Sequence, residues 1–202
     1  MLKTNFSYKI EHDFGLAPNP FWGYCTLAVC KPQIRRSKNL TIGSWIFGLG
    51  SRKLNNENYL IYAMRVQEKL TFVEYWNDPR FQLKKPIPNG SLKMIYGDNF
   101  YYQENGIWKQ NDSAHSLTDG PNENHMNRDL GGEHVLISQN FYYFGDKAIE
   151  IPERYQSGVV CPGRNICSKK LDERIAQNFV AWLQKNFTAG IIYGDPINWK
   201  KH

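Results

Sequence analysis

The sequence predicts a single α+β domain over residues 1–202, built mainly on an antiparallel sheet or a partly closed β-barrel. Several short stretches rich in Tyr, Ile and Val favour strands, and one long stretch has apolar residues at helical spacing. A chain of 202 residues, 41% hydrophobic and 14% aromatic, can bury a core without disulfides or metals. We therefore expect a sheet with a short helix in mid-chain and a long packing helix near the C-terminus.

The N-terminal third of the chain is expected to supply strands. Short apolar or alternating runs occupy residues 6–12, 22–30, 44–51 and 59–68. The second run lies between Pro20 and Pro32, and proline commonly marks the end of a strand. The fourth run, YLIYAMRVQE, has the strongest strand composition.

A short helix and a hairpin follow. Thr71 and Glu74 have the spacing of a capping box, so a helix is expected to begin there and to end before Pro79. Asn105-Gly106 is a dipeptide favoured in type I′ turns and lies between two aromatic runs. We therefore expect a β-hairpin within residues 93–110.

The second half begins with a polar stretch. Residues 111–133 contain almost no apolar side chain, and we expect a long polar loop, a feature that is usually functional or disordered. Strand character returns over residues 134–152. The long helix is predicted at 168–187, where Ser168 can act as the cap and an apolar stripe has helical spacing.

Charge is distributed unevenly along the chain. The net charge is +6, and residues 14–56 contain no Asp or Glu. The basic residues of that stretch are Lys31, Arg35, Arg36, Lys38, Arg52 and Lys53. Residues 96–150 are instead rich in acids. A basic face would attract phosphate or a polyanion, and the alternative is that the two regions neutralise each other across the fold.

The N-terminus lacks the apolar core of a signal peptide, and no run approaches the roughly 18 apolar residues of a membrane helix. We therefore expect a cytoplasmic protein that does not contact membranes. The four cysteines, Cys25, Cys30, Cys161 and Cys167, do not have the spacing of common zinc sites. Reduced, buried cysteines are expected, and a metal site, a disulfide or a reactive thiol remain the alternatives.

Candidate catalytic residues gather in the polar stretch. His115, Asp119 and Asp129 lie there with further His, Ser and Asn side chains, and His134 follows. Histidine with a carboxylate can perform acid–base chemistry or hold a divalent metal, although no standard metal-binding spacing occurs. A solvated turn region would have the same composition. The sequence leaves the cofactor unknown, with a divalent cation as one option and no residue assigned as a metal ligand.

Two further features point to a nucleotide. Asp98 and Asn99 interrupt an aromatic run, where they either form a turn with Gly97 or contact a base edge or sugar hydroxyl. Aromatic side chains such as Trp22 and Trp76 alternate with basic ones, as in proteins that stack on bases and bind phosphates. Most aromatic residues of a small domain are nevertheless core residues.

Taken together, several segments resemble the nucleotide-modification-associated (Nmad-type) domains of the second type, from bacteria and phages. They are FGLAPNPFWGYCTLAVCKPQIRR, GSWIFGLGS, LIYAMRVQEKLTFVEYWNDPRF, YGDNFYY, DSAHS and HVLISQNFYYFG. The resemblance runs from about Asp13 to Pro152, so it does not reach Cys161 and Cys167. A weaker similarity, at the level of the fold, is to the PUA and EVE barrels that bind modified bases.

The resemblance implies an association with hypermodified DNA bases or with phage–host conflict, and it implies a set of polar site residues. These are Asn19, Lys31, Arg35, Ser51, Asp98, Asn99, Ser113, His115, Ser116 and Asp129. We expect His115 to act as acid or base and Asp119 or Asp129 to be its partner. Lys31, Arg35 and Arg36 are expected to hold phosphate, and the other polar residues are expected to contact the substrate.

The predicted function is recognition or modification of a nucleotide or a modified base. The alternatives are a module that binds nucleotides or modified bases without catalysis, and an interaction protein in defence or counter-defence. A nucleotide or nucleic acid is the expected partner, and the sequence does not indicate an oligomeric state.

Overall fold

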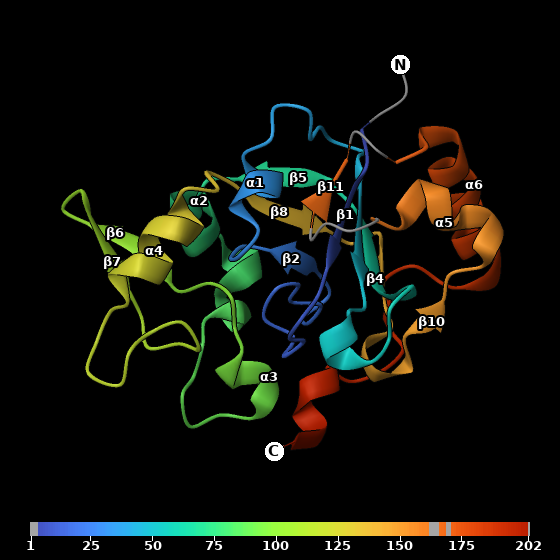
Figure 1. Ribbon diagram of the computed structural model, residues 1–202. Helices are drawn as coiled ribbons and strands as arrows, with labels where there is room; N and C mark the ends of the chain where they lie inside the picture. The colour runs from blue at the N-terminus through green and yellow to red at the C-terminus, as the bar shows by residue number, and fades with distance from the viewer. Residues whose placement is uncertain (1–3, 162–165, 169–170, 202) are drawn as a thin grey trace. The chain divides into compact units, whose positions relative to one another are not determined.

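The structure is a computed structural model that describes residues 4–161, 166–168 and 171–201 (Figure 1). The chain divides into two compact units. Unit 1 comprises Met1–Asp13, Lys38–Gln67 and Ser138–His202, and unit 2 comprises Phe14–Ser37 and Glu68–Ile137. The chain thus leaves unit 1 twice to build unit 2, and the single domain over 1–202 stays a prediction.

Unit 1 is built on one sheet. Within the described residues it contains β1 (Phe6–Lys9), β3 (Trp45–Leu49), β4 (Tyr59–Arg65), β9 (Phe141–Tyr143), β10 (Ile149–Glu150), β11 (Ile166–Cys167) and β12 (Ile191–Ile192). The strand order is β11-β1-β3-β4-β9-β12, and β10 pairs with β4. The central strand β4 is the YLIYAMR run, and its five inner residues are all buried.

The sheet is mixed and open. β1 and β3 are parallel, as are β9 and β12, whereas β3–β4 and β4–β9 are antiparallel. Among the described strands, none links β11 to β12, so no closed barrel forms. The prediction of a mainly antiparallel sheet is met in part, because two of the pairings in this sheet are parallel, and the predicted PUA-like barrel is not confirmed. The chain can form these parallel pairs because long connections precede them: the one from β1 to β3 includes Phe14–Ser37 of unit 2, and the one from β9 to β12 includes two helices of unit 1.

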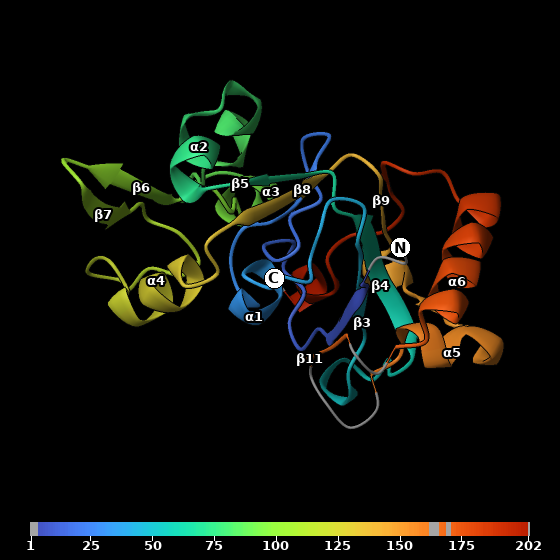
Figure 2. The same ribbon diagram turned by 90° about the horizontal axis from the view of Figure 1, so that it is seen from above.

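Helices α5 (Glu153–Val159) and α6 (Glu173–Asn186) lie beside this sheet (Figure 2). The buried face of α6 packs on the core of β3, β4 and β9, and the ring of Phe179 meets that of Phe47 at 5.9 Å. Within the predicted range 168–187, α6 begins after Asp172, whose side chain caps it in place of Ser168. Short 3-10 helices occupy Arg52–Leu54 (η1), Gly145–Lys147 (η3) and Ile197–Lys201 (η4).

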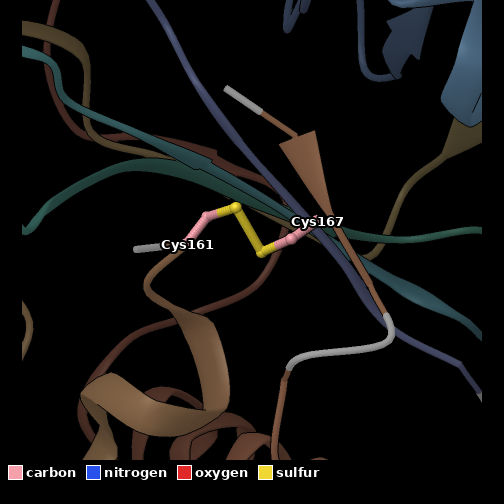
Figure 3. The surroundings of a disulfide bond; sticks show 2 residues. All are labelled: Cys161 and Cys167. Atoms are coloured by element: carbon pink, nitrogen blue, oxygen red, sulfur yellow. A yellow bond between two sulfur atoms is a disulfide. The ribbon is translucent and has the colours of Figure 1, made fainter. Parts of the chain in front are cut away.

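Unit 1 also contains a disulfide between Cys161 and Cys167 (Figure 3). The expectation of reduced cysteines is therefore wrong for this pair, and the disulfide alternative holds. Cys25 and Cys30 remain reduced, as expected, and Cys25 is buried. Spacing alone could not distinguish the two pairs, because a disulfide requires two Cα atoms to approach within about 7 Å and the fold decides this.

Unit 2 combines a three-stranded sheet, a hairpin and short helices. The sheet has the order β2 (Cys25–Leu27), β8 (Val135–Ser138) and β5 (Glu68–Leu70), and the hairpin consists of β6 (Tyr101–Glu104) and β7 (Ile107–Gln110). The helices are α1 (Pro32–Arg35), α2 (Phe72–Asn77), η2 (Pro79–Lys84), α3 (Leu92–Ile95) and α4 (Glu123–Leu130). β8 contributes to one core with α2, β6 and the residues Ala28 and Val29 that follow β2.

Two local predictions in unit 2 are confirmed. Thr71 and Glu74 form both hydrogen bonds of a capping box at the start of α2. Asn105 and Gly106 both have positive φ and connect β6 to β7, as a type I′ turn requires. These features form because neighbouring residues alone satisfy the backbone groups concerned.

The polar stretch 111–133 was predicted to be a loop, but it contains α4. Asn122 caps this helix by accepting a hydrogen bond from the backbone N–H of His125. Met126 and Leu130 pack against the core of unit 2, so a single narrow apolar stripe is enough to anchor the helix. The helix was missed because its composition is polar and its stability comes from tertiary contacts.

Candidate functional site

All residues of the candidate site lie in unit 2, and the site includes the turn between β2 and α1. Cys30 and Lys31 both have left-handed backbone conformations, with φ of 56° and 44°. Non-glycine residues in this region cost about 1–3 kcal/mol each, and such residues cluster at functional sites. The turn is maintained because surrounding side chains bind both backbone polar groups of Cys30.

His115 lies on a tight turn closed by two serines. Ser116 donates its backbone N–H and its hydroxyl to the carbonyl of Ser113, at 3.1 and 2.9 Å. The hydroxyl of Ser113 accepts from the backbone N–H of His115 at 3.3 Å. Ser113 and Ser116, predicted to contact substrate, are thus placed to hold the turn that carries His115.

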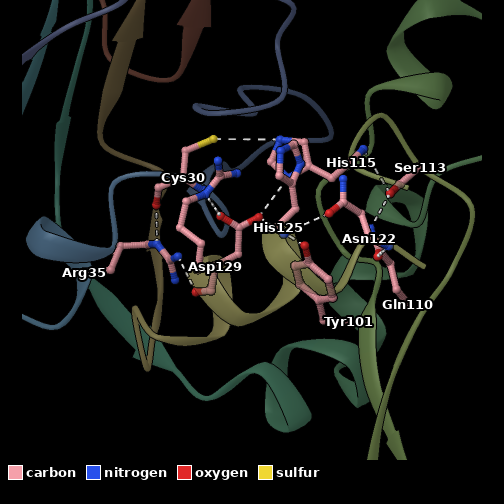
Figure 4. Close-up of polar contacts among 10 residues, drawn as sticks. Cys30, Arg35, Tyr101, Gln110, Ser113, His115, Asn122, His125 and Asp129 are labelled. Carbon is pink, nitrogen blue, oxygen red and sulfur yellow. Dashed lines mark hydrogen bonds and ion pairs between the residues drawn. The ribbon is translucent and has the colours of Figure 1, made fainter. Parts of the chain in front are cut away.

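Asp129 is fully buried in the last turn of α4 and connects three parts of the unit (Figure 4). Its Oδ2 lies 2.8 Å from Nδ1 of His115 and accepts from the hydroxyl of Tyr101 at 3.1 Å. Its Oδ1 accepts from the backbone N–H of Cys30 at 2.9 Å and from Nε of Arg128 at 3.3 Å. Four donors satisfy this buried carboxylate, as a charge removed from water requires.

The thiol of Cys30 lies on the other side of the same imidazole. The distance from Sγ to Nε2 of His115 is 3.9 Å, and Figure 4 shows the sulfur, the ring and the carboxylate in succession. His115 is 8% exposed and Cys30 is half-buried. A thiol, an imidazole and a carboxylate therefore form one connected series.

The electrostatics of the site favour charged forms. Burial alone would lower the pKa of His115, but its hydrogen bonds and electrostatic interactions with Asp129 and Cys30 raise that pKa to about 9. Burial likewise opposes ionisation of Asp129, but His115 and Arg128 hold its pKa below the ordinary value. At neutral pH the site thus contains a carboxylate and a protonated imidazole.

Arg35 lies behind the site rather than at its surface. The guanidinium is fully buried and donates to the carbonyl oxygens of Cys30 at 2.8 Å, His134 at 2.9 Å and Asp129 at 2.5 Å. Burial lowers its pKa to about 10, so it remains charged at neutral pH. The predicted phosphate contact does not fit this position, because the guanidinium has no exposed surface.

A second buried polar cluster contains three of the predicted substrate residues. The ammonium of Lys84 donates to the carbonyl and side-chain oxygens of Asn19, at 3.1 and 2.6 Å. Asp98 accepts from the hydroxyls of Thr26 and Tyr75, and Asn99 donates to the carbonyls of Tyr75 and Phe81. Asn19, Asp98 and Asn99 are 0–1% exposed, so their contacts are internal.

Burial dominates the ionisation of this second cluster. It raises the pKa of Asp98 and lowers that of Lys84 to about 8. The lysine was not singled out from the sequence, because a buried lysine has no local signature. This cluster joins the β2 strand to η2 and to the segment before β6, which positions the core of unit 2.

The remaining predicted residues are Asp119, Ser51, Arg36 and Lys31. Asp119 is exposed, and the carboxylate that pairs with His115 is that of Asp129. Ser51 belongs to unit 1. Lys31 directly follows Cys30 and is half-buried, and Arg36 directly follows α1 and is exposed.

Sequence reasoning placed Cys30 among core cysteines and did not select Tyr101 or Arg128. The available signal for Cys30 was its position at the end of a strand, directly before Lys31-Pro32. Among the described residues, no group of three His, Cys, Asp or Glu side chains is arranged to hold a metal ion. In the same part of the chain, no helix is long and apolar enough to cross a membrane.

The fold and the site define a mixed α/β protein with a buried cysteine–histidine–aspartate arrangement in its second unit. The chain belongs to the nucleotide modification associated domain 2 family, whose model matches residues 2–202. The match extends beyond the range from Asp13 to Pro152 over which the resemblance was recognised, and it includes Cys161 and Cys167. No curated protein and no solved structure matches the chain.

Proposed function

We propose that this protein acts on a nucleotide, or on a modified base in DNA, with His115 as its acid–base group. Membership of the family connects the chain with nucleotide modification. The observation that carries the proposal is the buried contact of 2.8 Å between Nδ1 of His115 and Oδ2 of Asp129. A DNA-modification or phage–host conflict setting, as the sequence resemblance implied, is consistent with this chemistry.

The contact assigns a role to each nitrogen of the ring. An ionised carboxylate can only accept, so Nδ1 carries the proton that faces Asp129. Nε2 is then the atom that exchanges a proton with a reacting group. With a pKa of about 9, His115 begins as an acid at neutral pH and becomes a base once it has donated that proton.

Arg36 and Lys31 are the proposed phosphate contacts in place of Arg35. Lys31 directly follows Cys30, and Arg36 directly follows α1 and is exposed. Arg35 becomes a positioning residue that holds the turn through the carbonyl of Cys30. Because phosphate contacts with exposed cations weaken with salt, binding is expected to decrease as ionic strength rises.

The test compares wild type with His115→Asn. Asparagine can still donate to Asp129 but lacks the Nε2 group, so the buried carboxylate keeps a partner. Thermal shift is measured with nucleoside mono- and triphosphates, their 5-hydroxymethylpyrimidine forms and DNA containing those bases, and the same mixtures are analysed for products by mass spectrometry.

We expect at least one of these compounds to stabilise the wild-type protein and to be converted by it. The same compound should stabilise His115→Asn equally, but the variant should convert that compound at least 100-fold more slowly. Conversion at the wild-type rate by the variant would remove His115 from the mechanism. Stabilisation without conversion by the wild type would favour a non-catalytic binding module. No stabilisation by any compound would contradict the proposal and favour an interaction protein.

A further inference from the structure

We propose that Cys30 is a catalytic nucleophile, which makes the site a thiol-dependent acyl-transfer centre. The inference deepens the proposed function and rests on it only for the substrate class, a nucleotide that carries an amide- or ester-linked group. The covalent chemistry itself stands on Cys30, His115 and Asp129.

The first argument is the order of the three groups. Sγ of Cys30 lies 3.9 Å from Nε2 of His115, and Nδ1 of the same ring lies 2.8 Å from Asp129. A nucleophile beside a base, with the base oriented by a third group, is the arrangement of serine and cysteine acyl-transfer enzymes. Contacts to the nucleophile are commonly longer before substrate binds.

The second argument is the fixed position of the sulfur. The backbone N–H of Cys30 donates to Asp129 and its carbonyl accepts from Arg35, and both of these side chains are fully buried. Cys30 also has a left-handed backbone conformation. The strained turn is therefore held from both sides, and a reactive group benefits from such support because its geometry is set before substrate arrives.

The third argument is the contrast with the other cysteines. Cys161 and Cys167 are joined to each other. Cys25 is fully buried, and burial raises the pKa of its thiol far above the ordinary value. Cys30 is half-buried and has an imidazole beside its sulfur. A protonated imidazole stabilises the thiolate form of a neighbouring cysteine, and the thiolate is the nucleophile.

The reaction can be written in two balanced steps. The thiolate of Cys30 attacks the carbonyl carbon of the acyl group and an S–C bond forms, while the bond to the amine or alcohol breaks and that leaving group takes the Nε2 proton of His115. Water then attacks the thioester, His115 takes one proton of that water, and the carboxylic acid leaves as the thiolate returns. An amine in place of water would give transfer instead of hydrolysis.

The test uses 4-nitrophenyl acetate as the acyl donor, because it requires no nucleotide. The full-length wild type is compared with Cys30→Ser, Cys25→Ser and His115→Asn, and the labelled protein is digested and mapped by mass spectrometry. Wild type and Cys25→Ser are expected to release about one nitrophenolate per chain in a burst and to carry one acetyl group on Cys30 that neutral hydroxylamine removes. Cys30→Ser is expected to show no burst.

His115→Asn is expected to slow the burst at least tenfold, because the group that exchanges the proton is lost. Acetylation of Cys25 instead of Cys30, or a burst of unchanged rate in His115→Asn, would overturn the proposal. A readout without any variant is the alkylation of the wild-type protein by iodoacetamide at pH 7, mapped by mass spectrometry. Alkylation of Cys30 well ahead of Cys25 supports the proposal, and alkylation of the two at equal rates contradicts it.

The two proposals fail in distinguishable ways. Acetylation of Cys30 without stabilisation by any nucleotide would keep the nucleophile and remove the substrate class. Stabilisation by a nucleotide without acetylation of Cys30 would keep the proposed function and remove the nucleophile.

Discussion

The protonation state of His115 determines what this site can do. The imidazole is almost completely buried, and its two nitrogens face a carboxylate and a thiol. Removal of a histidine from water normally favours the neutral ring, but a buried carboxylate at hydrogen-bond distance outweighs this effect here. The same pair that supports the proposed acid–base role therefore contributes to the stability of unit 2.

The stability of the protein is expected to depend on pH through this pair. The folded-state pKa of His115 is raised from 6.5 to about 9, so its contribution is complete below pH 6.5 and is lost as the pH rises through 9. The loss in the free energy of unfolding is up to about 3 kcal/mol. Chemical unfolding at several pH values measures this loss.

In His115→Asn the decline between pH 6.5 and 9 should be absent. An NMR titration provides a direct check, in which His115 should titrate above His125, whose pKa is lowered by burial and by the nearby His115. Equal titration points for the two rings would contradict the assigned ion pair. On the acid side the sign reverses, because the pKa of Asp129 is lowered and its contribution is lost as the pH falls below 3.8.

Between elements, Arg35 connects the β2–α1 turn with the end of α4 and the start of β8. Its guanidinium donates a hydrogen bond to one carbonyl oxygen on each of the three segments. A planar guanidinium can do this because its N–H groups point in several fixed directions. Gly132 packs directly against it, and a Cβ atom there would overlap the guanidinium. One buried side chain thus joins segments that carry Cys30 and Asp129.

Arg35→Met keeps much of the side-chain volume but removes the hydrogen-bond donor of three backbone carbonyls, those of Cys30, His134 and Asp129. We expect the free energy of unfolding to fall by about 3 kcal/mol or more, since each buried unsatisfied group costs about 1–3 kcal/mol. Arg36→Met is the matched control, because Arg36 is the exposed neighbour and its replacement should change stability by less than about 0.5 kcal/mol. Urea unfolding of both variants measures the difference, and equal effects would contradict the internal role of Arg35.

At the scale of the whole molecule, residues 14–56, which contain no Asp or Glu, are divided between the two units. Lys31 and Arg36 lie in unit 2, whereas Lys38, Arg52 and Lys53 lie in unit 1. Arg52 is paired with Glu57, at 3.2 Å. The positive charge therefore does not belong to one unit, and the part relevant to the proposed site is the pair Lys31 and Arg36, which follows Cys30 in the chain.

The number of free thiols is a property of the whole chain that the structure defines. The sequence has four cysteines, and the structure joins Cys161 to Cys167, so two thiols are expected in protein denatured without reductant. Titration with a thiol reagent should give two per chain before reduction and four after it. Cys25→Ser should lower the first number by one, and four thiols before reduction would contradict the disulfide.

The sequence by itself determined the features that neighbouring residues settle. The capping box of Thr71 and the Asn105-Gly106 turn depend on contacts within a few residues, and the central strand β4 follows from its composition. The sequence also indicated the family. It placed His115 and Asp129 among the candidate catalytic residues because histidine and carboxylate side chains gather in one segment.

Only the tertiary structure decided which residues meet. Asp129 rather than Asp119 pairs with His115 because α4 forms and buries the former, and α4 depends on packing against the core of unit 2. Cys30 joins the pair from a turn 85 positions away from His115 in the chain. The burial of Arg35 has the same origin. Contacts of this kind depend on how distant segments pack, and no local pattern of residues encodes them.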